Sequence, residues 1–191
     1  MTSLVEQLTL SELKEFLNEK VLKYNNPKFI KSDPIQIPHS FTQKEDIEIS
    51  AFLVATIAWG NRKSIIKSSL KMMELLEQAP HEFIMNYQRK DLDNLLPFVH
   101  RTFNGTDLIQ FIENLHHVYT NHNGLEAVFT KFAQENSVQS SIHNFKKVFF
   151  ENIVLRYMTI VTRSPFSVRT ILPSCILWCH YVAVSTGFWI V

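Results

Sequence analysis

The sequence has few glycines and few cysteines, and each scarcity excludes a class of protein. Four glycines among 191 residues argue against Gly-rich phosphate-binding loops and against a β-sandwich with many tight turns. Two cysteines, Cys175 and Cys179, exclude a disulfide scaffold and indicate a reducing compartment. The N-terminal residues contain acids and lack a basic run followed by an apolar stretch. We therefore expect no signal peptide and a cytoplasmic protein.

An excess of charge of one sign is also lacking. Lys and Arg total 19 against 18 acids, a formal net charge of +1, so no overall field attracts the chain to nucleic acid or acidic lipid. Hydrophobic residues make up 46% and charged residues 19%, which excludes general disorder. A chain of this length forms one domain, or one domain with a tail.

Helical spacing of apolar residues runs along the chain to about residue 160. It predicts an all-α domain of about seven helices joined by short links, without sustained strand alternation. The predicted helices lie at about residues 10–24, 44–58, 62–77, 80–87, 107–119, 125–132 and 140–160. We expect the second to be buried, because it is apolar nearly all round. The stretch 25–40 contains three prolines and is predicted to be an extended connection.

Polar residues at the predicted helix starts indicate how several helices are capped. Thr9–Glu12 and Thr42–Glu45 both fit the capping-box pattern. Asn61 is the expected cap of the third helix, and Ser140 or Ser141 that of the last.

The third predicted helix carries a basic face. Lys63, Lys67 and Lys71 recur every four residues, with Arg62 at the helix start. Such a face can contact phosphates, and the helix N-terminus would add N–H donors and a favourable dipole. The simpler interpretation is a solvated face opposite the apolar stripe of the same helix, Ile65, Ile66, Leu70, Met73 and Leu76.

Residues 100–107 form the richest polar cluster of the sequence. Histidine, arginine, asparagine and aspartate within eight residues can form a site where a loop meets a helix N-terminus. The simpler alternative is an Asn104-Gly105 turn followed by an N-cap at Thr106 or Asp107. That alternative gives His100 and Arg101 no role.

The predicted helix 107–119 and the link after it contain His116, His117 and His122. His116 and His117 are neighbours in the sequence, so on a helix their side chains point about 100° apart. The three histidines match no known metal motif, and we expect them to be surface residues. Cys175–His180 lacks a second pair of ligands. No metal site and no cofactor are therefore expected.

The composition changes towards the C-terminus. There is no acid beyond Glu151, no lysine beyond Lys147 and no charge beyond Arg169. We predict a helical domain at residues 1–163 and an atypical apolar tail at 164–191, truncated or out of frame. The last 21 residues are long enough to cross a membrane, but Pro173 and Gly187 interrupt them. Packing, or contact with a protein partner, is the favoured interpretation over a membrane anchor.

Three motifs together resemble an uncharacterised bacterial family, domain of unknown function 2400, over about residues 10–160. They are the run Phe52–Lys67, the Tyr24–Pro27 segment with Asp33-Pro34, and Phe98–Asn104. The buried helix with the Gly60-Asn61 loop and the helix that follows also resembles the opening of the helix-hairpin-helix DNA glycosylase superfamily. In that superfamily the corresponding loop can wedge into the DNA stack.

The chain departs from the glycosylase pattern at its catalytic elements. It contains no leucine-proline-glycine-x-glycine hairpin, and the acid that should follow such a hairpin is absent beyond Glu151. The resemblance therefore implies an incomplete helix-hairpin-helix-like domain that is not itself a competent enzyme. Its leading function is association with nucleic acid, DNA being the expected partner, through Gly60, Asn61, Arg62, Lys63, Lys67, Lys71 and Arg101. The alternatives are a structural or partner-binding helical domain with a hydrophobic C-terminal segment, and an enzyme whose catalytic half is missing.

Overall fold

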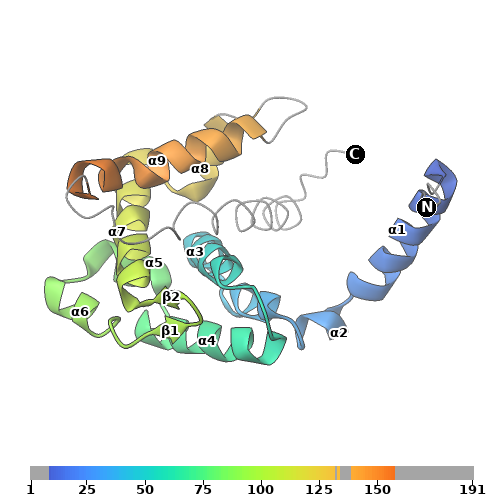
Figure 1. The fold of residues 1–191 in the computed structure, drawn as a ribbon, viewed down its shortest axis with the longest axis horizontal. Coiled ribbons are helices and arrows are strands. Elements are labelled where there is room, and N and C mark those ends of the chain that lie inside the picture. The colour runs from blue at the N-terminus through green and yellow to red at the C-terminus, as the bar shows by residue number, and fades with distance from the viewer. Residues whose placement is uncertain (1–8, 132, 134–138, 158–191) are drawn as a thin grey trace, which may run out of the picture.

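The computed structural model describes residues 9–131, 133 and 139–157. The described part is mainly helical, as predicted, with a single two-stranded antiparallel sheet (Figure 1). Its α-helices are α1 (Leu10–Tyr24), α2 (Pro27–Ile30), α3 (Lys44–Thr56), α4 (Arg62–Leu75), α5 (Pro80–Asn86), α6 (Arg89–Asp93), α7 (Gly105–His122), α8 (Leu125–Lys131) and α9 (Gln139–Tyr157). The strands are β1 (Val99–His100) and β2 (Phe103–Asn104), and two 3-10 helices are η1 (Pro34–Gln36) and η2 (Pro38–Ser40). The predicted number of helices was too low, because short helical turns occupy segments expected to be links.

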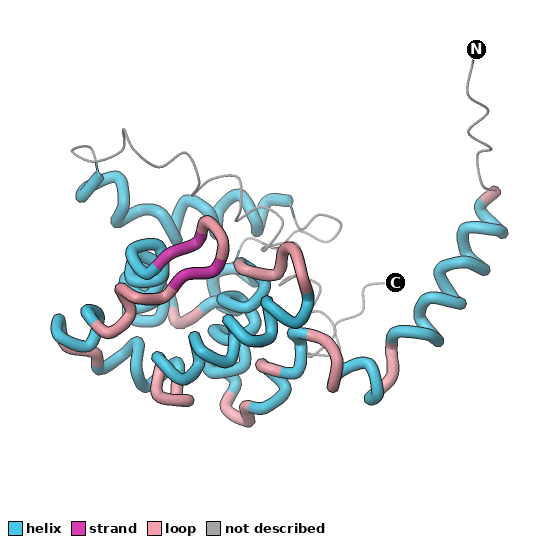
Figure 2. Tube along the Cα trace, turned by 60° about the horizontal axis from the view of Figure 1, so that its bottom comes forward, coloured by secondary structure: helices cyan, strands magenta, loops and turns pink. Residues whose placement is uncertain are grey.

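Helix α1 starts as predicted but buries nothing. Thr9 and Glu12 form the expected capping box, with the Thr9 N–H donating to Glu12 Oε2 over 2.8 Å. None of its side chains is buried, and the helix extends away from the other helices (Figures 1 and 2). Its apolar residues therefore face solvent.

The segment 25–40 is not the predicted extended connection. It forms α2, η1 and η2, and a proline stands in the first turn of each. Asn26 Oδ1 accepts from the Lys28 N–H over 3.1 Å, and Asp33 Oδ1 accepts from the Ile35 N–H over 3.1 Å. Proline is compatible with the first turn of a helix. These prolines therefore begin short helical turns and do not hold the segment in an extended conformation.

Helix α3 is the centre of the core, as predicted. Ile49, Phe52, Leu53 and Ile57 are at most 1% exposed. The Phe52 ring lies 5.3–5.9 Å from three other phenylalanine rings, those of Phe111, Phe145 and Phe149. The predicted capping box at Thr42–Glu45 is wrong, because the N-cap is Gln43 and its side chain makes no capping hydrogen bond.

A carboxylate of α3 caps a neighbouring helix. Asp46 is 8% exposed, and its Oδ1 accepts a hydrogen bond of 2.8 Å from the N–H of His81, in the first turn of α5. A negative charge at this end is favoured by the helix dipole. The bond fixes α5 against α3 across 35 residues of chain.

The predicted turn at Asn104-Gly105 is also wrong. The strands pair Val99 with Asn104 and His100 with Phe103, so the turn lies at residues 101–102, where Arg101 has a φ of +56°. Asn104 is the N-cap of α7, and it forms a capping box with Asp107. Two-residue strands are too short to show an alternating pattern in the sequence.

The C-terminal helices α8 and α9 pack against each other and against α7, and α8 also contacts α3. Helix α8 begins at Leu125, after the left-handed residue Asn123 (φ +60°) and Gly124. The predicted caps Ser140 and Ser141 lie inside α9, and the buried Ser141 hydroxyl donates to the Phe129 carbonyl over 2.9 Å. The predicted tail at residues 164–191 lies outside the described residues. Within those residues, no helix has both the length and the apolar character needed to cross a membrane.

Candidate nucleic-acid interface

The loop between α3 and α4 requires glycine. Gly60 has a φ of +105°, a conformation that residues with a side chain rarely adopt. A Cβ at this position would lie 2.5 Å from Arg101 Cζ and 2.6 Å from Arg101 Nε. Asn61 then caps α4 as predicted, accepting from the Ser64 N–H over 3.3 Å. Gly60 thus allows Arg101 to pack directly on the loop.

The β1–β2 hairpin holds this loop against α4. The Arg101 guanidinium lies 5.1 Å from the centroid of the Trp59 ring, within cation–π range. His100 meets the Trp59 ring edge-on at 6.3 Å, and its Nδ1 lies 2.8 Å from Ser68 Oγ of α4. The structure therefore brings Arg101 to Gly60, although the two are 41 positions apart in the sequence. Figure 2 shows the hairpin in magenta, packed beside the helices.

His100 is neutral in this setting. The residue is buried, with only 3% of its surface exposed. Burial lowers the pKa of His100 below its ordinary value. A hydrogen bond with the Trp59 backbone partly offsets this effect, and the positive charge of Arg101 adds to it. His100 therefore positions the hairpin and carries no positive charge at neutral pH.

The lysines of α4 form an exposed row. Lys63, Lys67 and Lys71 are all exposed, and they share one face of α4 with Glu74. The opposite face of the helix is buried, with Ile65, Ser69, Met72, Met73 and Leu76 facing the core. Leu70, predicted for that core face, is instead 47% exposed and lies among the lysines. The buried positions 65, 69, 72 and 76 follow the 3.6-residue period more closely than Leu70 does.

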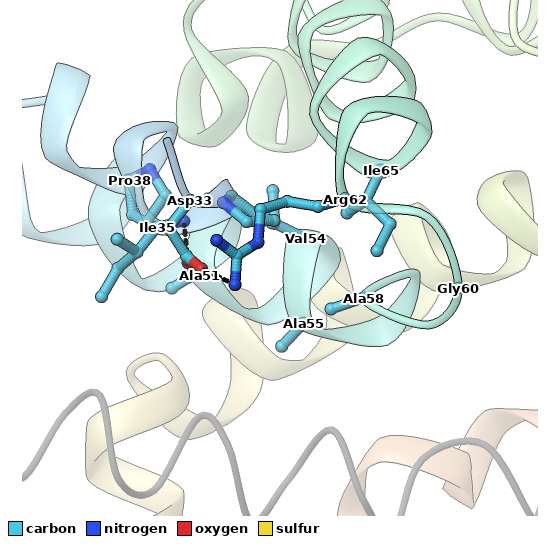
Figure 3. A pocket seen from close by; sticks show the side chains of 11 residues that line it. Asp33, Ile35, Pro38, Ala51, Val54, Ala55, Ala58, Gly60, Arg62 and Ile65 are labelled. Atoms are coloured by element: carbon cyan, nitrogen blue, oxygen red, sulfur yellow. Dashed lines mark hydrogen bonds and ion pairs between the residues drawn. The ribbon is translucent and has the colours of Figure 1, made fainter. Parts of the chain in front are cut away.

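Arg62 lies apart from the lysine row. Its Nη2 is 3.7 Å from Asp33 Oδ2, and its guanidinium is 5.4 Å from the centroid of the Phe29 ring. Arg62 lines a pocket of about 390 Å³ between η1, α3 and the start of α4 (Figure 3). Asp33 partly neutralises its charge, so Arg62 contributes less to the basic face than the sequence suggests.

Sequence reasoning missed one cluster of polar side chains. His117 and His122 of α7 meet Glu151 of α9, and one ligand atom from each lies within 4.8 Å of the others. His116 points elsewhere, with its ring 5.7 Å from that of Tyr87. The divergence of adjacent histidines was predicted correctly, but Glu151 is 34 residues beyond His117 and no local motif links them.

The chain belongs to the family described as "Protein of unknown function (DUF2400)", whose family model matches residues 33–171. The match confirms the family expected from the three sequence motifs. No curated protein and no solved structure matches the chain. The similarity to the helix-hairpin-helix DNA glycosylases stays a prediction.

Proposed function

We propose that the protein associates with nucleic acid by contacting the phosphate backbone with the exposed lysine row of α4. The observation that carries the proposal is the placement of Lys63, Lys67 and Lys71 on one exposed face of α4. At 1.5 Å per residue the row is about 12 Å long. Phosphates of one DNA strand recur about every 3.4 Å along the axis, so the row spans about three to four intervals between phosphates.

The loop at one end of the row supports the same function. The N-terminus of α4 follows Asn61 directly, and the first N–H groups of a helix point outward and attract anions. Arg101 lies on Gly60 at this end and is exposed. A phosphate placed at the loop would meet these N–H groups and a guanidinium, while its neighbours met the lysines.

The charge balance sets the kind of binding that we expect. The whole chain has a net charge of only +1, so no overall field adds to the attraction of this face. Glu74 lies on the same face and opposes that attraction. Contacts to phosphates carry no sequence information. The proposed binding is therefore weak, independent of base sequence and strongly reduced by salt.

Substituting Lys67, the central lysine, tests the proposal. Fluorescence anisotropy at low salt would measure binding of the full chain and of Lys67→Ala to two labelled duplexes of unrelated sequence. We expect Lys67→Ala to weaken binding by the same factor for both duplexes. The matched control is Lys14→Ala, an exposed lysine on α1, which should bind like the original chain. Absence of binding by the original chain at low salt, or equal losses in the two variants, would contradict the proposal.

A second candidate function, binding of a protein partner, is favoured by α1. Leu13, Phe16, Leu17 and Val21 are each 40–53% exposed, and their spacing places them on one side of the helix. Exposed apolar surfaces of this kind mark interaction sites. We propose that this face pairs with α1 of a second copy.

Sedimentation velocity over a range of concentrations tests this pairing. The original chain should associate, and a Leu17→Asp/Val21→Asp variant should stay monomeric with an unchanged melting temperature, because neither residue is buried. A monomer at all concentrations, or equal association of both chains, would show that α1 does not pair with a second copy.

A further inference from the structure

We propose that His117, His122 and Glu151 form a binding site for a divalent transition-metal ion such as Zn²⁺. Each residue offers one ligand atom, and the three atoms lie within 4.8 Å of one another. Imidazole nitrogens and carboxylate oxygens are the donors that Zn²⁺ takes in proteins. The site is independent of the lysine row of α4, which belongs to another helix.

The fold brings the three ligands together at a helix crossing. His117 and His122 lie in the last turns of α7, which ends at His122 before the left-handed residue Asn123. Glu151 lies on α9, which packs against α7 (Figure 1). The rings of His117 and His122 approach to 5.2 Å between centroids. An ion bound here would join the two helices.

The environment of His117 is the second observation that points to a ligand. Its Nε2 atom is buried and, among the residues that the structure describes, has no hydrogen-bond partner. The same atom lies 3.8 Å from Glu151 Oε2, longer than a hydrogen bond. An ion between these atoms would satisfy both.

The other nitrogen of His117 is already held in place. Asn121 Nδ2 donates to His117 Nδ1 over 2.9 Å and to the His117 carbonyl over 3.2 Å. When Nε2 binds a metal, Nδ1 carries the ring proton and needs an acceptor. Rotation of the Asn121 amide by half a turn would present its carbonyl oxygen to that proton, at the cost of the hydrogen bond from the amide to the His117 carbonyl. Asn121 can therefore serve as the outer partner that orients the ligating ring.

Metal binding requires the three ligand atoms, which lie within 4.8 Å of one another, to approach one another by up to about 1.5 Å. With bonds of about 2.0–2.2 Å, the ligands of a tetrahedral ion lie about 3.3 Å from one another. Glu151 is 63% exposed at its side chain, so it can rotate towards the histidines without disturbing the core. Three protein ligands leave one tetrahedral position for water or an external ligand, as in catalytic zinc sites.

Isothermal titration calorimetry with Zn²⁺ tests the site. The full chain, freed of metal with a chelator, would be compared with His117→Ala, His122→Ala and Glu151→Gln. The matched control is His116→Ala, because His116 adjoins His117 in the sequence but contacts Tyr87 instead. Melting temperatures without metal would show that each variant folds, and Glu151→Gln keeps an exposed side chain of the same shape.

We expect one site to be lost or weakened in the three ligand variants and unchanged in His116→Ala. The loss should exceed the 10–100-fold that removal of an outer partner costs. Zn²⁺ should also raise the melting temperature of the original chain and of His116→Ala, but not of His117→Ala. An ion that binds the folded chain and not the unfolded chain stabilises the fold, and only a chain with an intact site can bind it. Zn²⁺ binding of equal affinity and stoichiometry in all five chains would overturn the proposal by assigning it to other residues, and so would no binding at all.

Discussion

Replacing Gly60 by alanine tests how the loop of the candidate interface is built. The backbone at Gly60 has a φ of +105°, and holding alanine in such a conformation costs about 1–3 kcal/mol. The new Cβ would also meet the Arg101 guanidinium at 2.5–2.6 Å from Cζ and Nε. Arg101 is exposed and can move, but it then gives up its contact with the Trp59 ring, worth about 0.5–1 kcal/mol. Gly60→Ala should therefore lower the free energy of unfolding by about 1.5–4 kcal/mol.

Urea unfolding of four chains separates the two contributions. They are the original chain, Gly60→Ala, Arg101→Ala and the double variant. When Arg101 is already truncated, Gly60→Ala should cost only its backbone strain, so the two changes should be less than additive by about 0.5–1 kcal/mol. A Gly60→Ala variant as stable as the original chain would refute the positive φ. Full additivity would refute the packing of Arg101 on the loop.

Three further predictions concern the core and the hairpin. Phe52→Ala should lower the free energy of unfolding by about 3–5 kcal/mol, because Phe52 is 1% exposed among three phenylalanine rings. Leu53→Asp should leave a buried, unpaired carboxylate and unfold the domain. A cooperative melt of either variant near that of the original chain would contradict the central position of α3. The pKa of His100 is lowered in the folded protein, so the unfolded chain takes up the proton first, and stability should fall as the pH drops through about 6.5 towards the folded value. Urea unfolding at pH 7 and pH 5 should show a smaller loss in His100→Gln, and equal losses would show that His100 does not contribute.

Local capping and burial were predictable from the sequence. Thr9, together with Glu12, caps α1 as expected, and Asn61 caps α4. These caps were predictable because each involves residues at most three positions apart in the sequence. The burial of α3 followed from its lack of a polar face. The error at Asn104 was a choice between two roles that the same residues fit, a turn residue or an N-cap.

Contacts between distant segments were not predictable. Asp46 caps α5 from 35 positions away, and His100 reaches Ser68 across 32 positions. Glu151 meets His117 only because α9 crosses α7. Periodicity reports which face of a helix is buried, but not which side chains of two elements meet. The candidate basic row lies on a single helix and was therefore found, whereas the histidine–glutamate cluster was not.

The dependence of binding on salt tests the proposed nucleic-acid interface most directly. The measurement is the slope of log K against log salt concentration for a DNA duplex, for the original chain and for a Lys63→Ala/Lys67→Ala/Lys71→Ala variant, with Lys14→Ala as the control. Each lysine on a phosphate adds about 0.9 to the slope, so the triple variant should have a slope smaller by up to about 2.7, and Lys14→Ala should match the original chain. A triple variant with the same slope and affinity as the original chain would show that the lysine row does not contact phosphates.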